Sequence, residues 1–166
     1  MSRPTHNPLT LRRVLQQELA LGKRMIALAE TMTDLLVNQE TERLAALEAE
    51  QRECREQHEA LEQARIAVTR SLAGALGLEG LPTLAELLPL LPAREQEPLK
   101  RLRLELLTTQ ETLARLNARN RRLLDNALEY VRFSLELLTS AALQPARYGT
   151  NLASVAAPTF YIDSKA

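Results

Sequence analysis

Cys54 and His58 are the first side chains in this 166-residue sequence that could carry chemistry. They are four residues apart, so on a helix both could contact one metal ion, or a thiolate could lie beside an imidazole. A metal site needs further ligands, and the neighbouring Glu50 and Glu62 are ordinary for an exposed helix. Nothing marks an orienting third group or an oxyanion site. His6 is the only other histidine. We therefore expect no metal, no cofactor and no catalytic residues, and we predict that the protein is not an enzyme.

Arg115, Arg119 and Arg122 form a basic stripe, because spacings of four and three residues bring side chains to one face of a helix. Such a stripe could contact phosphates. However, Lys plus Arg equals Asp plus Glu at 21 each, and the region lacks stacking aromatics. We interpret the stripe as a solvated face and predict no nucleic-acid partner. A nucleic-acid or anionic-surface binder, with steeply salt-dependent binding, remains an alternative.

The elements that position these residues are helices. Leu (35) and Ala (23) dominate, with 18 Glu and 18 Arg, and this composition is typical of long helices and coiled coils. β-branched apolar residues and glycine are scarce, which argues against a sheet. We predict an all-α fold: an elongated antiparallel helical bundle, coiled-coil-like, with long helices over residues 1–143 and a flexible C-terminal tail over 144–166.

Four helices are expected, at about 9–37, 40–73, 83–88 and 94–143. In the first, two neighbouring apolar rows make a stripe wider than one partner helix would cover, so a bundle of three or more helices is expected. A tight reversal is expected near 37–41, with Asn38 or Thr41 as the N-cap of the second helix. The middle of that helix, 48–59, lacks large aliphatic residues and should protrude or be covered on one side only.

A short helix and a long one complete the predicted bundle. Gly74, Gly77 and Gly80 should end the second helix. Thr83 and Glu86 form a capping box for a short apolar helix that covers the end of the bundle. The last helix keeps a three-four spacing from Leu99 onward, with mostly apolar residues and a few polar ones, among them Thr109, Asn120 and Ser134. A buried Asn at position 120 would fix helix register.

The chain is expected to be soluble and cytoplasmic. A single Cys forms no internal disulfide, and residues 2–8 lack the apolar core of a signal peptide. The longest uncharged run, 148–162, is interrupted by Gly149 and Pro158 and is too short for a membrane span, so no stable membrane insertion is expected.

Asn117 and Asn120 also carry a family resemblance. The run Leu116-Asn117-Ala118-Arg119-Asn120-Arg121-Arg122-Leu123-Leu124, followed after a proline by Tyr148-Gly149, resembles the FlgN family of flagellar type III export chaperones. The order of a Leu-rich helix, a Glu-rich helix, a variable middle and an Asn-bearing helix is also similar to that family.

The resemblance implies a chaperone that binds the hook-filament junction proteins FlgK and FlgL, prevents their premature association and delivers them to the export gate. A client helix would join the bundle as an extra member. The predicted client-binding residues are Leu113, Leu116, Asn117, Asn120, Leu123, Leu124, Tyr130 and Leu137. Asn117 and Asn120 would fix the register, unless the protein's own core uses these residues. By the same resemblance, Tyr148 and Gly149 would dock on the export-gate protein FlhA.

A structural coiled-coil protein that self-associates through its heptad rows is the other function class. It explains the apolar spacing but not the tail, which holds three of the five aromatic residues.

Overall fold

The computed structural model describes residues 8–142, and every regular element in that range is helical. The elements are α1 (Pro8–Val37), the 3-10 turn η1 (Thr41–Arg43), α2 (Leu44–Ala75), α3 (Leu84–Leu87), the 3-10 turn η2 (Leu88–Leu90) and α4 (Ala93–Ala142). The chain divides into two units, the first ending at Leu128 and the second starting at Glu129, so α4 contributes to both. The all-α prediction is confirmed.

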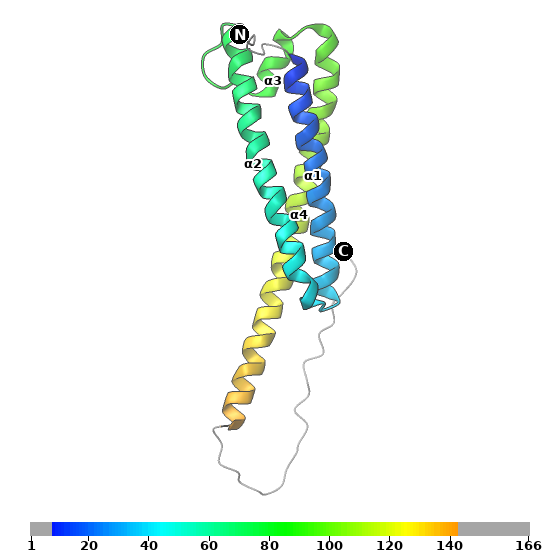
Figure 1. The fold of residues 1–166 in the computed structure, drawn as a ribbon, viewed down its shortest axis with the longest axis vertical. Helices are drawn as coiled ribbons and strands as arrows, with labels where there is room; N and C mark the ends of the chain where they lie inside the picture. Colours follow the sequence, from blue (N-terminus) through cyan, green and yellow to red (C-terminus); the bar gives the residue numbers. More distant parts are fainter. Residues whose placement is uncertain (1–7, 143–166) are drawn as a thin grey trace, which may run out of the picture. The chain divides into compact units, whose positions relative to one another are not determined.

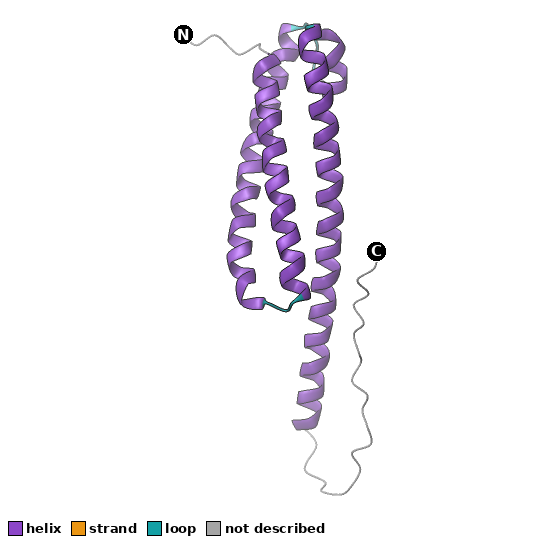
Figure 2. Cartoon of the chain, turned by 90° about the vertical axis from the view of Figure 1, so that its right-hand side faces the viewer, coloured by secondary structure: helices purple, strands orange, loops and turns teal. Residues whose placement is uncertain are grey.

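In the first unit, α1, α2 and the first part of α4 lie side by side as a three-helix bundle (Figures 1 and 2). Ion pairs show the helix directions. Arg24 bonds Glu53 at 3.2 Å and Arg65 bonds Glu18 at 3.0 Å, so α1 and α2 are antiparallel. Arg12 bonds Glu95 at 3.1 Å and Lys23 lies 3.6 Å from Glu105, so α1 and α4 are parallel.

The two apolar rows predicted for the first helix are both covered, which explains why α1 needs two neighbours. Residues Leu11, Val14, Leu21 and Leu35 of one row are buried, as are Leu15, Leu19 and Ala29 of the other. Helix α4 approaches closely at Gly22, where an added Cβ would lie 2.7 Å from Thr109 Cγ2. The missing side chain is therefore what allows this contact between α1 and α4.

One end of the bundle is closed by α3 and η2, as the capping box predicts. The Thr83 hydroxyl accepts a hydrogen bond from the Glu86 amide, and the Glu86 carboxylate accepts one from the Thr83 amide at 2.7 Å. Leu87, Leu88 and Leu91 then enter the main core beside Leu11, Leu72 and Leu99. Helix α2 ends at Ala75, and Gly77 (φ 73°) follows its C-cap Leu76. The Leu78 amide bonds the Ala73 carbonyl, which makes this a glycine-containing C-terminal turn of the Schellman type.

The reversal at the other end is present, but its capping differs from the prediction. Neither Asn38 nor Thr41 is an N-cap: η1 follows Glu40, α2 follows Arg43, and neither start has a side-chain cap bond. Instead α1 ends in a Schellman-type turn, with the Glu40 amide bonded to the Leu35 carbonyl and Gln39 at φ 58°. Because a 3-10 turn follows, α2 starts at Leu44, four residues later than expected.

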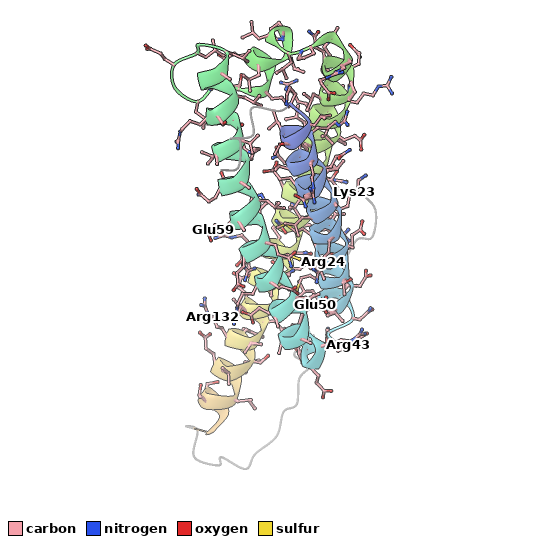
Figure 3. All side chains as sticks on the ribbon, turned by 45° about the horizontal axis from the view of Figure 1, so that its top comes forward. Lys23, Arg24, Arg43, Glu50, Glu59 and Arg132 are labelled. Carbon is pink, nitrogen blue, oxygen red and sulfur yellow. The ribbon has the colours of Figure 1, made fainter. Side chains whose placement is uncertain are left out.

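The polar middle of α2 is covered on one side only. Among residues 48–59, Cys54 is fully buried and Gln51 is half-buried, whereas the others are exposed. Glu59 points away from α1 and α4 in Figure 3. A small side chain at position 54 thus provides the buried contact that larger aliphatic residues provide elsewhere.

Candidate functional site

Asn120 is the most buried of the predicted client-binding residues, with 6% of its surface exposed. Its amide nitrogen donates to the Ala29 carbonyl at 2.8 Å, and its amide oxygen accepts from the Thr33 hydroxyl at 2.6 Å. Both partners lie on α1. In this state its side chain is therefore engaged inside the bundle, as the register-fixing interpretation requires.

Asn117 lies one turn earlier and is exposed. It lines a small cavity of about 120 Å³ together with Leu113 of α4, residues of α1 and, from α2, Gln51, Cys54 and Arg55. The two asparagines therefore have different surroundings. Asn120 is a buried link between helices, whereas Asn117 is accessible from outside.

The four predicted leucines in the first unit differ in how much of each side chain is exposed. Leu113, Leu116 and Leu123 are half-buried, and Leu124 is 40% exposed. Asn120 is the last buried residue of α4 in the first unit, and its partner Thr33 lies near the end of α1, four residues before Val37.

In the second unit, residues 130–138 of α4 present large apolar side chains to solvent. Tyr130 and Leu137, both predicted client-binding residues, are 55% and 49% exposed. Four further residues were missed by the sequence analysis: Val131, Phe133, Leu135 and Leu138, which are 48–68% exposed. Residues 131, 135 and 138 form another three-four apolar spacing in the sequence. The prediction used only the row that continues the buried one, so it did not include them.

The Cys54 and His58 pair is not assembled into a site. The thiol is fully buried, whereas His58 is exposed. Within residues 8–142, no group of three or more His, Cys, Asp or Glu side chains could hold a metal ion.

The arginines at 115, 119, 121 and 122 are all exposed, as a solvated face would be. In the first unit, exposed cations of α1 pair with acidic neighbours: Lys23 with Glu105 and Arg24 with Glu53. Figure 3 labels Lys23 and Arg24.

Two carboxylates of the first unit are largely covered. Glu95, at the start of α4, bonds Arg12, and its side chain is 7% exposed. Glu18 bonds Arg65 between α1 and α2; burial raises the pKa of Glu18, and the Arg65 guanidinium opposes this only in part. Both pairs link helices inside the bundle.

The proposed docking residues Tyr148 and Gly149 lie outside the described residues. Across the part of the chain that is described, no helix is long and apolar enough to cross a membrane.

The model of the FlgN protein family matches residues 9–153. The chain belongs to the FlgN family. The match includes the bundle, the asparagine-bearing helix and the exposed end of α4, and it confirms the resemblance seen in the sequence. FlgN proteins are known as flagellar export chaperones and are not an enzyme family, so the comparison supports a general chaperone function. Searches of curated proteins and of solved structures found no match.

Proposed function

We propose that this FlgN-family protein is a cytoplasmic export chaperone for the hook-filament junction proteins FlgK and FlgL. It binds a terminal helical segment of each client, prevents premature association of the clients, and delivers them to the export gate. The proposal rests on the family and on one structural observation, the exposed apolar surface of α4 after Glu129.

That surface is unusual for a helix in water. Six large apolar residues within nine positions, Tyr130 to Leu138, are each about half exposed or more. Contiguous apolar surface of this kind marks an interaction site rather than ordinary surface variation. An amphipathic helix from a client would cover it and would itself be shielded, as in other helix-in-groove complexes.

The residues of the first unit have a different role in this proposal. Leu113, Leu116 and Leu123 are half-buried, and Asn120 is bonded to α1. They hold α4 in the bundle, while Asn117 and Leu124 remain accessible to the client. We therefore place the strongest client contacts at Tyr130 and Leu137.

Tyr148 and Gly149 are proposed to dock on the export-gate protein FlhA. A single tyrosine beside a glycine is a small anchor, suited to weak and reversible capture. Tyr148→Ala should leave client affinity unchanged and lower capture by purified FlhA. Equal capture of mutant and wild type would remove this part of the proposal.

Calorimetric titration of the full chain with purified FlgK and FlgL tests the proposal. Saturable binding is expected, and Leu137→Ser should weaken it about tenfold or more, because a central apolar contact is lost. The matched control is Asp125→Asn, an exposed residue of α4 that precedes the apolar segment. No binding of either client to the wild type would overturn the proposal.

Self-association through the same apolar residues is the second candidate function. The exposed residues of α4 could also pair with a second copy. Light scattering separates the two: a monomer at the concentrations used for titration agrees with the chaperone proposal, whereas a fixed dimer that persists in the presence of client favours the structural coiled coil.

A further inference from the structure

The exposed apolar residues of the second unit form two rows, not one. The first row is Val131, Leu135 and Leu138, and the second row is Tyr130, Phe133 and Leu137. All six are 48–68% exposed. At 3.6 residues per turn the centres of the two rows are about 130° apart around the helix, with the small Ser134 between them.

The two rows together span an apolar arc of about 200°. A helix that packs on one partner surface needs an arc of about 100°. A single client helix laid on either row would therefore leave the other row in water. The remaining arc is polar and contains Glu129, Arg132 and Glu136; Arg132 is labelled in Figure 3.

We infer that the end of α4 binds two amphipathic helices of one client at the same time, one on each row. The inference rests on the proposed chaperone function and specifies its partner. The client must present a pair of helices, each with apolar residues at three-four spacing over about four turns, which is the length of residues 129–142. A client with a single amphipathic segment would not complete the surface.

Two other occupants fit less well. In a symmetric dimer, the same patch of each copy meets its counterpart, so one row would be covered and the other left exposed. The chain's own segment 143–166 has a three-four apolar spacing at Tyr148, Leu152 and Val155, but it is divided by Pro145 and Pro158. Because proline interrupts helices, its longest proline-free stretch, residues 146–157, is shorter than the four turns that each row requires and would not cover both rows.

The charges beside each row distinguish the two client helices. By helical position, Arg132 lies next to the first row, whereas Glu129 and Glu136 lie next to the second. Flanking charges select partner helices in coiled coils. The helix on the first row should therefore carry acidic flanking residues, and the helix on the second row basic ones.

The test uses the full chain and purified FlgK in three forms: intact, lacking its N-terminal helix and lacking its C-terminal helix. Leu135→Ser changes the first row and Leu137→Ser the second, and both are exposed, so helical content by circular dichroism should not change. Asp125→Asn, on the polar side of α4, is the control.

Each serine variant is expected to weaken binding of intact FlgK about tenfold, and the control to leave it unchanged. When one client helix is removed, only one of the two serine variants should still weaken binding. When the other client helix is removed, only the other serine variant should still do so. Arg132→Glu should likewise act through one client helix, and Glu129→Lys through the other.

If intact FlgK binds and one serine variant has no effect, a single helix is bound and the inference is wrong, while the chaperone function stands. If both variants act equally on both truncated clients, the rows are not assigned to separate helices and the inference also fails. Absence of any binding by the wild type would instead overturn the proposed function.

Discussion

At the scale of single residues, Asn120 shows how one polar side chain can serve the fold rather than the client. Its amide satisfies a carbonyl and a hydroxyl of α1 in a site that is otherwise closed to water. A buried amide with both groups paired is compatible with a stable core, whereas an unpaired one is not.

We therefore predict that Asn120→Asp destabilises the bundle. The carboxylate would face the Ala29 carbonyl without a proton to donate and would be buried without a cation, at a cost of about 2–4 kcal/mol. Urea denaturation followed by circular dichroism measures this. Asn117→Asp, an exposed change of the same type three residues earlier, is the control and should be nearly neutral. Equal stability of both variants would show that the Asn120 bonds do not hold α4 to α1.

Two carboxylates should affect stability in opposite directions as pH changes. Burial raises the pKa of Glu18, so the folded state binds its proton more tightly than the unfolded state. The contribution of Glu18 to stability therefore falls as pH rises from the ordinary glutamate pKa through the raised one. Glu18→Gln should raise the free energy of unfolding at pH 7, and this gain should vanish at pH values below the ordinary pKa.

Glu86 is the matched comparison, because the Thr83 backbone amide and hydroxyl bond its carboxylate and lower its pKa. Its contribution is present above the ordinary pKa and is lost as pH falls through the lowered one. Glu86→Gln should therefore destabilise the protein at pH 7 and not at strongly acidic pH. If both variants changed the free energy of unfolding at pH 7 in the same direction, these assignments would be contradicted.

At the scale of elements, the turn between α1 and η1 contains a residue in an unfavourable conformation. Gln39 has φ 58°, a left-handed conformation that glycine adopts without strain and that other residues adopt at a cost. Gln39→Gly should raise stability by about 0.5–1 kcal/mol.

Asn38→Gly is the control for this turn, since among the described non-glycine residues only Gln39 has a positive φ. Glycine at position 38 gains no relief from strain and adds freedom to the unfolded chain, so it should not stabilise. Thermal denaturation of the two variants tests this prediction. A higher midpoint for Asn38→Gly than for Gln39→Gly would contradict it.

The elements themselves were predictable because their signals are local. Apolar spacing, the Thr83–Glu86 capping box and the glycines after α2 each act within a few residues. The turn at Gln39 was not predictable, since its hydrogen bonds use backbone groups and a residue that is uncommon there. Nor could the spacing on α4 show which of its positions are buried, because that depends on the helices that pack against it.

The same limit applies to the candidate site. Tyr130 and Leu137 were chosen from the row that continues the buried seam, and both are exposed. Asn120 lies on that row too, yet it is bonded to α1 inside the bundle. Sequence spacing identifies the face of a helix, but which positions on that face are covered is a property of the assembled helices.

At the scale of the whole molecule, two parts of α4 differ in how much of their apolar surface is buried. Between Leu99 and Leu123 it contributes buried or half-buried residues to the bundle, whereas the large apolar residues from Tyr130 to Leu138 are all exposed. A short helical stretch without tertiary contacts is only marginally stable in water. Regions with few buried apolar contacts open locally at low free-energy cost.

Amide hydrogen exchange should therefore be much faster for residues 129–138 than for residues 99–123 in the free protein. Adding FlgK should slow exchange in the first range and change the second little, because the client covers both apolar rows. The measurement is made at two protein concentrations. If residues 129–138 exchange slowly at both protein concentrations in the absence of client, this segment is already covered within one chain. Protection that increases with concentration would favour self-association, since only a second copy of the chain responds to concentration in this way.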